Sequence, residues 1–428
     1  MVSSQRGRSR AMGLDVSSVL PFEQSAAESL RGLQKVVRAV IRAVPGESDG
    51  ATSLSKAMSI QFSLAWKLWR FAEEGDLFVG GQHVPGRLGL KRFCEAAGSL
   101  GIDEALIDGV NECFRSFEHV VHLHAGDRAT FDIMLASHTE QTDPRADLVH
   151  RKQAFRANSY ILGLHASTMF GRFALGPSEL DPDYFDVVVV HGYVDLKRLR
   201  PSAPWRTSRG TRSTSGGSSS RLGRRELLFP CDGDSDVSAM HELPLLHDYC
   251  SKPLPEFEKL PGRSDVNGYQ LASGAVGQTN TTSFLFGEVL RCAQERYHRN
   301  VIDPVTHFRQ RVRTPVELGV LELVFHREAF AGEIPRFDLF TQLFETGSID
   351  RFTPSERIHI HERPILLESA GSAPACSAIP HYDTMTRRMF ERLQWDPADY
   401  SMLRIEIQYP PIPSGMFFSY ELENQPRD

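Results

Sequence analysis

The chain has 428 residues, of which 41% are hydrophobic and 24% are charged, and its formal net charge is -6. This composition is ordinary for a globular protein, and the length indicates two or three domains with sizeable cores. The negative net charge shows that the protein as a whole is not basic, so a nucleic-acid partner would require a local basic surface.

The cysteine spacing and the hydropathy bear on the cell compartment and on membrane association. The six cysteines are scattered and form no C-x-x-C pair, which argues against a zinc ribbon or a disulfide framework and favours a reducing cytoplasm. The run of valines at 187–190 is far shorter than the roughly 18 apolar residues of a membrane span. The early arginines precede no apolar stretch, so we expect neither a secretory signal nor a membrane partner.

The N-terminal region is predicted to be a tail followed by helices. Residues 1–20 are rich in serine and arginine, and we expect them to be disordered. Apolar residues at helical spacing over 29–44 predict a helix that ends at Pro45 and Gly46. Four basic residues form a stripe on the other side of this helix: Arg31, Lys35, Arg38 and Arg42.

The most specific pattern in the chain lies in residues 54–71, LSKAMSIQFSLAWKLWRF. Seven apolar, small or turn residues fall at the spacing of a helix-turn-helix: Leu54, Ser55, Met58, Ser59, Ile60, Ala65 and Leu68. Over residues 52–72 the chain resembles the helix-turn-helix of bacterial transcription regulators, with Ser59 where glycine is commonest. The resemblance implies two short helices at a steep angle, of which the second enters a DNA major groove.

Polar side chains gather on one side of the second helix. At about 100° per residue, Leu64, Leu68 and Phe71 lie on one side, with Ser63, Lys67 and Arg70 opposite. Such cations and hydroxyls can bond to guanine edges or phosphates. Residues 31–70 also carry seven cations against two anions. The candidate DNA-binding residues are therefore Gln61, Ser63, Lys67, Arg70, Arg38 and Arg42.

The rest of the chain shows mixed patterns. Helical spacing predicts helices at 88–98 and at 103–124, the latter capped by Asp103, and a mostly helical stretch from 126 to 175. Further helices are expected around 284–298 and 383–394. Apolar, β-branched or alternating residues predict strands in three segments: 184–196, 317–330 and 402–422.

These elements predict an α+β protein. An all-helical helix-turn-helix domain is expected at 21–140, and a larger α+β domain at 141–428, with helices packed on one face of an antiparallel or mixed sheet. Residues 201–226 are rich in serine, glycine and arginine and nearly lack apolar side chains. Because such a segment buries too little surface to offset its ordering entropy, we expect a flexible loop there.

The motifs favour a regulator over an enzyme. The sequence has no phosphate-binding loop, no dinucleotide fingerprint and no nucleophile elbow, so we identify no catalytic or metal-ligating residue and expect no cofactor. The sequence predicts a cytoplasmic DNA-binding transcription regulator that could dimerise on paired half-sites. Its C-terminal domain would sense an unidentified small-molecule effector or mediate oligomerisation. Two alternatives stay open: a protein-binding or assembly module, and an enzyme with an unrecognised C-terminal site.

Overall fold

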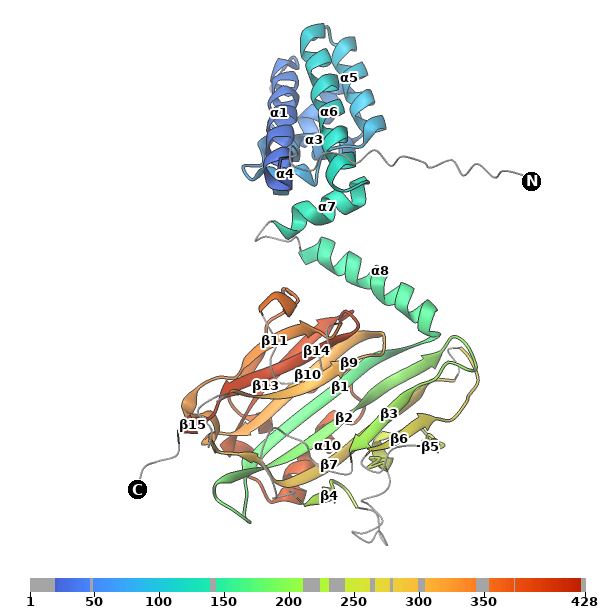
Figure 1. Ribbon diagram of the computed structural model, residues 1–428, viewed down its shortest axis with the longest axis vertical. Helices are drawn as coiled ribbons and strands as arrows, with labels where there is room; N and C mark the ends of the chain where they lie inside the picture. The colour runs from blue at the N-terminus through green and yellow to red at the C-terminus, as the bar shows by residue number, and fades with distance from the viewer. Residues whose placement is uncertain are drawn as a thin grey trace, which may run out of the picture. The chain divides into compact units, whose positions relative to one another are not determined.

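The computed structural model divides into two compact units, residues 1–143 and 144–428, each described by itself (Figure 1). The sequence predicts the domain boundary between residues 140 and 141. The structure describes residues 20–46, 49–138, 144–210, 224–230, 243–261, 266–277, 280–298, 305–343, 354–372 and 374–424. The expected N-terminal tail, apart from Leu20, and residues 211–223 of the expected loop lie outside the described residues.

The first unit is helical in all its regular elements. Its helices are α1 (Phe22–Ala43), α2 (Ala51–Met58), α3 (Phe62–Glu73), α4 (Leu77–Gly81), α5 (Arg87–Ser99), α6 (Glu104–His124) and α7 (Arg128–Ser137). Three of them begin behind an aspartate whose carboxylate accepts hydrogen bonds from first-turn N–H groups: Asp76, Asp103 and Asp127. The predicted Asp103 cap is confirmed, as are the helices expected at 29–44, 88–98 and 103–124.

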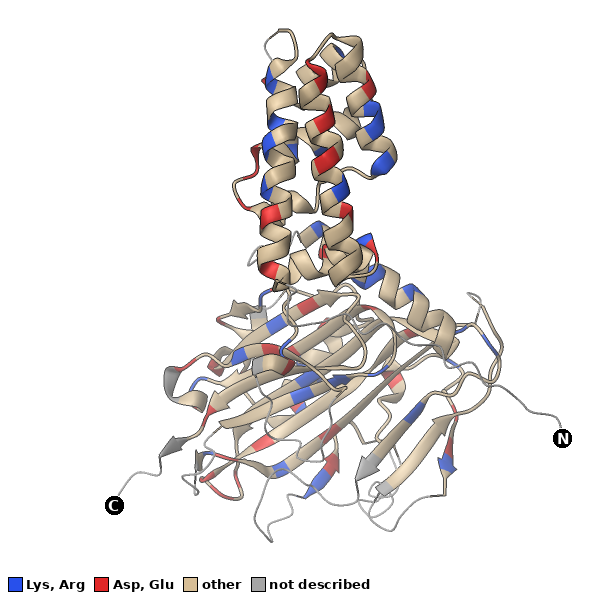
Figure 2. Cartoon of the chain, turned by 45° about the horizontal axis from the view of Figure 1, so that its top comes forward, with Lys and Arg blue, Asp and Glu red and all other residues tan. Residues whose placement is uncertain are grey.

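The core of this unit lies between α1 and α6 and extends to α3 and α7. Leu30, Leu33, Val37, Phe71 and Phe131 are each 0% exposed and belong to one hydrophobic cluster. The apolar stripe read from the sequence of α1 is thus the side that packs, as expected for an amphipathic helix. Figure 2 shows basic side chains along one side of α1 and acidic side chains recurring along α6.

The second unit begins with α8 (Pro144–Leu162) and is built on a seven-stranded sheet. The strand order is β12 (Ile365–Leu367), β13 (Tyr400–Gln408), β10 (Val316–His326), β1 (Leu164–Pro177), β2 (Tyr184–Arg198), β7 (Thr282–Glu295) and β4 (Arg225–Leu227). β1 and β10 pair in parallel, and the other neighbours pair antiparallel. The sheet is therefore mixed.

Three smaller sheets accompany the central one among the described residues. The first is β11 (Arg336–Thr341), β14 (Ser414–Glu421) and β9 (Val305–Val312). The second is β3 (Arg206–Gly210), β6 (Val266–Leu271) and β5 (Phe257–Leu260). The third pairs β15 (Glu423–Asn424) with β8 (Tyr297–His298).

Both faces of the central sheet are covered, and β10 shows how. Val320 and Val324 share a cluster with the apolar side of helix α10 (Tyr382–Leu393). Leu321 and Leu323 point to the other face, where they share a cluster with residues of β11, β14 and β9. This alternation follows from the two-residue period of a strand. The predicted α+β class is confirmed.

Two helical predictions are wrong for one physical reason. Residues 284–298 are mainly strand β7, and residues 164–175, the end of the stretch expected to be helical, are strand β1. Both strands lie inside the sheet with apolar residues on both faces: Phe284 belongs to one cluster and Leu285 to the other. A strand buried on both faces shows no polar–apolar alternation, so its sequence is easily mistaken for a buried helix.

The ends of the segment 201–226 carry β3 and part of β4. Trp205, within that segment, is 7% exposed and packs edge-on against Tyr193 and Phe284 at ring-centroid distances of 5.5 and 4.8 Å. A single tryptophan in a polar stretch thus attaches one end of the segment to the core.

None of the helices in the described part of the chain is both long and apolar enough to cross a membrane.

Candidate nucleic-acid interface

The pattern at residues 54–71 corresponds to the helix pair α2 and α3, joined by a three-residue turn. Ser59 has φ 51° and ψ 37°, in the left-handed region that glycine adopts most easily. Its N–H donates to the carbonyl of Lys56 at 3.3 Å. The N–H of Ile60 donates to the carbonyl of Ser55 at 3.2 Å, and the Ser55 hydroxyl donates to the carbonyl of Ile60 at 2.7 Å. These bonds fix the direction in which α3 leaves the turn.

The inner side of the pair is fully packed. Leu54 and Leu68 are 0% exposed and Met58 is 3% exposed, and Ala65 lies among them at 0%. Alanine at this position lets the two short helices approach closely. Burying one leucine contributes about 2 kcal/mol, so this contact holds α3 in a defined orientation.

The outer side of α3 brings together four of the candidate residues. Gln61, Ser63, Lys67 and Arg70 are all exposed, on the side opposite the buried alanine and leucine. Arg70 has one ion-pair partner there, Glu74, one helical turn on at 3.2 Å. Exposed pairs of this kind contribute little to stability, so the guanidinium can exchange its partner at low cost.

Lys67 is close to an acidic neighbour. Burial raises the pKa of Asp132 on α7, and the charges of Arg128 and then Lys67 act against that rise. The ammonium group of Lys67 therefore lies within electrostatic range of the Asp132 carboxylate. The cations of α3 can bind a ligand, but this carboxylate partly offsets their positive potential.

Two aromatic side chains share this surface. Phe62 is 56% exposed and Trp66 is 43% exposed, and the Trp66 ring meets His83 edge-on at 5.1 Å. Sequence reasoning gave no role to Phe62. The outer face of α3, defined as Phe62, Ser63, Trp66, Lys67 and Arg70, therefore combines two cations, a hydroxyl and two rings.

Arg38 does not belong to this exposed set. Its guanidinium donates to the carbonyl of Ala72 from both Nε and Nη2, and Nε lies 3.8 Å from a carboxylate oxygen of Glu73. Its neighbour Gln34 donates to the carbonyls of Phe71 at 2.8 Å and Glu74 at 2.9 Å. The last carbonyls of a helix have no partners within it, so α1 supplies them for α3. Arg38 thus positions α3 from behind.

Arg42 is exposed on α1, as are Arg31 and Lys35, and among the described residues none of the three has an ion-pair or hydrogen-bond partner. The six candidates therefore separate into an outer α3 group, a structural Arg38 and a free cation on α1. Sequence reasoning missed Gln34 and His83, whose roles depend on contacts between segments distant in the chain.

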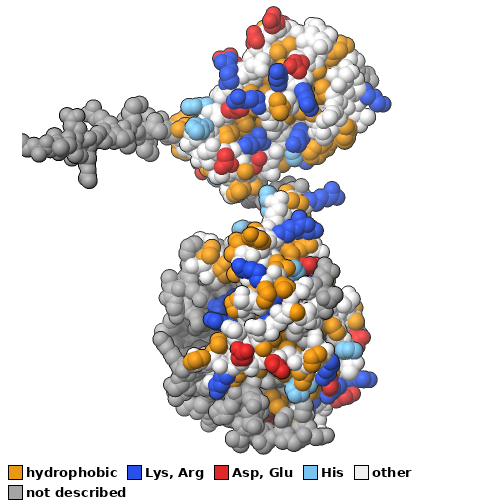
Figure 3. All heavy atoms as spheres, turned by 90° about the vertical axis from the view of Figure 1, so that its right-hand side faces the viewer, with side chains coloured by type: hydrophobic (Ala, Val, Ile, Leu, Met, Phe, Trp, Pro, Cys, Tyr) orange, Lys and Arg blue, Asp and Glu red, His pale blue; other side chains and the backbone are white. Residues whose placement is uncertain are grey.

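The remaining surface of this unit is not uniformly basic. Described residues 20–46 and 49–138 contain 12 lysines and arginines against 14 aspartates and glutamates. On the face of the helical unit that Figure 3 shows, basic, acidic and apolar side chains are interspersed. A phosphate-binding surface would therefore be confined to particular helices.

No group of three metal-ligating side chains occurs within the part of the chain that the structure describes. Comparison with known proteins adds no relationship: no family model matches this sequence, and neither a curated protein nor a solved structure does.

Proposed function

We propose that the chain is a DNA-binding transcription regulator that inserts α3 into the major groove. The observation that carries the proposal is the outer face of α3, where Ser63, Lys67 and Arg70 are exposed on a helix held from behind. The turn at Ser59 fixes one end of this helix, and hydrogen bonds from Gln34 and Arg38 fix the other. A rigid polar face is what groove recognition needs, because ordering costs are already met in the free protein.

Within this proposal each polar residue has a role. Lys67 and Arg70 would contact phosphates or guanine edges, and Gln61 and Ser63, near the start of α3, would hydrogen bond to bases or phosphates. Arg42 on α1 would add phosphate contacts that carry no sequence information. The second unit would sense a small-molecule effector or mediate the dimerisation that places two copies of α3 on paired half-sites.

The test compares matched pairs of cations. Fluorescence anisotropy with a labelled random duplex would be recorded for the wild type, Lys67→Ala/Arg70→Ala and Lys91→Ala/Arg92→Ala. The control residues are also exposed and lie on α5. We expect the α3 variant to lose about tenfold or more in affinity, and the α5 variant to keep wild-type affinity. Equal losses, or no binding by the wild type at low salt, would refute the proposal.

A second candidate is assembly through the same helix, and the exposure of Phe62 and Trp66 favours it. Exposed aromatic pairs are typical anchors of protein interfaces. In this case two copies would associate through α3, and Phe62→Ser/Trp66→Ser would convert a dimer into a monomer in sedimentation velocity. A variant that remains dimeric, or a wild type that is monomeric at high concentration, would eliminate assembly through α3.

A further inference from the structure

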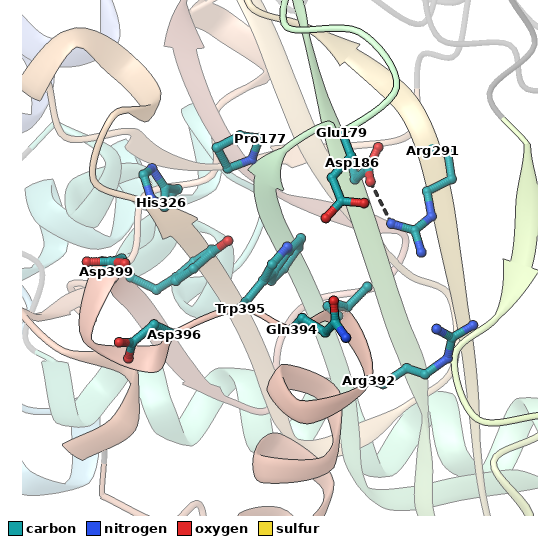
Figure 4. A pocket seen from close by; sticks show the side chains of 12 residues that line it. Pro177, Glu179, Asp186, Arg291, His326, Arg392, Gln394, Trp395, Asp396 and Asp399 are labelled. Atoms are coloured by element: carbon teal, nitrogen blue, oxygen red, sulfur yellow. Dashed lines mark hydrogen bonds and ion pairs between the residues drawn. The ribbon is translucent and has the colours of Figure 1, made fainter.

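A pocket of about 460 Å³ opens in the second unit, at the C-terminal end of α10 (Figure 4). Its residues come from segments distant in the chain: the end of β1 and the β1–β2 connection, β2, β7, the end of β10, the end of α10 and the segment from there to the first residue of β13. This volume lies in the range of small-molecule sites. No motif predicts it, and its use is independent of whether α3 binds DNA.

The pocket has a flat aromatic wall that the backbone is shaped to hold. Trp395 stacks on Tyr400 with ring centroids 5.0 Å apart and planes 20° apart. A Cβ atom at Gly176 would lie 2.4 Å from the indole of Trp395 and 2.5 Å from the hydroxyl of Tyr400. Since no side chain fits there, a glycine on β1 is required for the two rings to lie against the strand.

The Tyr400 hydroxyl is an unused polar group in this wall. Tyr400 is 2% exposed and lines the pocket, and its hydroxyl has no hydrogen-bond partner among the described residues. Burial first, and then the charges of Asp399 and Asp186, raise the pKa of this hydroxyl, so it stays protonated. Because the hydroxyl oxygen is not among the fully buried unpaired atoms of the described residues, it is open to the pocket, where water or a ligand can bond to it.

The ionisable lining has an excess of negative charge. Four carboxylates line the pocket against two guanidiniums: Glu179, Asp186, Asp396 and Asp399 against Arg291 and Arg392. Arg291 is already bonded to Asp186 at 2.7 Å and to Glu226 at 3.0 Å, and Arg392 lies 3.7 Å from Glu226. The cations are thus neutralised within the protein. The C-terminal end of α10 adds the negative end of a helix dipole.

Glu179 and Asp399 remain available to a ligand. Both are exposed, and neither has a side-chain partner among the described residues. In Figure 4 Trp395 lies between them, with Asp396 and Asp399 on one side and Glu179 and Asp186 on the other. Because Asp186 is paired with Arg291, Glu179 supplies the uncompensated negative charge on its side, and Asp396 and Asp399 supply it on the other.

We propose that this pocket binds a small aliphatic diamine or polyamine. Its two ammonium groups would contact Asp399 and Glu179, and its methylene chain would lie against Trp395. Ammonium groups and the methylenes beside them are attracted to indole faces. The Tyr400 hydroxyl accepts a hydrogen bond from one ammonium. A neutral ligand of the same length lacks these attractions. An anionic ligand lacks them too and is repelled by the net negative charge of the lining.

The test is isothermal titration calorimetry of the full chain, without DNA, with putrescine and spermidine as probes. The comparators are butylamine, 1,4-butanediol and succinate. We expect both probes to bind, butylamine to bind more weakly, and the diol and the dianion not to bind. Butylamine equal to putrescine, or equal binding of the diol, would overturn the proposal, as would no heat with either probe.

Substitutions of the two exposed carboxylates test the proposed binding residues without changing the buried core. Asp399→Asn and Glu179→Gln should each weaken putrescine binding about fivefold, the loss of one partly screened ion pair. Asp383→Asn is the matched control, because Asp383 is exposed on α10 and does not line the pocket. Unchanged affinity in both lining variants would refute the assignment. Since no DNA is present, failure here leaves the proposed DNA binding untouched, and the reverse also holds.

Discussion

Two groups of cations in this molecule differ in how fully they are paired with carboxylates of the protein itself. In the second unit, Arg172 and Arg404 are 0% and 7% exposed, and each places Nε 2.7 Å from a different carboxylate oxygen of Glu322. On α3, Lys67 and Arg70 are exposed, and Arg70 has a single partner on its own helix. The buried group is committed to the fold, whereas the exposed group can bind a partner.

The buried group is an interlocked network rather than one pair. Tyr382 donates its hydroxyl to Glu322 at 2.8 Å, and burial raises the pKa of Tyr382 to about 12, so the hydroxyl stays a donor. Arg172 also donates to the Thr386 hydroxyl at 2.9 Å. These bonds connect α10 to β1, β10 and β13. One carboxylate thus bonds to side chains from a helix and from two neighbouring strands of the central sheet.

The largest expected effect comes from breaking this network. Glu322→Gln leaves two buried guanidiniums without an anion, and we expect a loss of about 3–5 kcal/mol in the stability of the second unit. Hydrogen exchange on β1, β10 and β13 would localise the loss. Glu317→Gln is the matched control, because Glu317 is exposed on the same strand. Equal protection in the two variants would show that the network does not hold α10 on the sheet.

A smaller effect is expected behind α3. Gln34→Leu removes two donors to the carbonyls of Phe71 and Glu74, and we expect a loss of about 2 kcal/mol, measured by urea unfolding of the first unit. Val36→Leu, on the same helix but only partly buried, provides a control. Should Gln34→Leu unfold like the wild type, the claim that α1 holds the end of α3 would be contradicted.

The smallest effect concerns an exposed pair, His138 and Glu23, whose side chains lie 3.0 Å apart. The Met134 carbonyl and then Glu23 raise the pKa of His138, and its own backbone N–H and then His138 lower the pKa of Glu23. The His138 contribution is therefore lost as pH rises through its folded pKa, above 6.5. The Glu23 contribution is lost as pH falls through its folded pKa, below 4.5.

The difference in melting temperature between wild type and His138→Gln should accordingly be greatest between about pH 4.5 and 6.5. Melting curves recorded from pH 3 to 9 would check this window. A difference that does not vary with pH would mean that the pair contributes packing and no electrostatic stability. Glu28→Gln on α1 supplies a comparison without this pairing.

The sequence predicts the helical unit well because its signals are local. Pro45 ends α1, Asp103 caps α6, and the buried side of α3 follows from helical spacing. The central strands β1 and β7 are missed because they are buried on both faces and lack the polar–apolar alternation that marks a half-exposed strand. Local patterns identify elements whose two sides face different environments.

The candidate site divides in the same way. Spacing alone predicts that Ser63, Lys67 and Arg70 share an exposed face. It cannot predict that Arg38 turns to the carbonyl of Ala72, because that contact joins residues 34 positions apart. The pocket in the second unit is invisible to spacing, since Glu179 and Asp399 come from distant segments.

The salt dependence of DNA affinity tests the central claim most directly. If Lys67 and Arg70 contact phosphates, the slope of log affinity against log salt for Lys67→Ala/Arg70→Ala should be shallower than the wild-type slope by about two. The Lys91→Ala/Arg92→Ala control should keep the wild-type slope. A wild-type slope in the α3 variant would contradict the assignment of α3 as the DNA-binding helix.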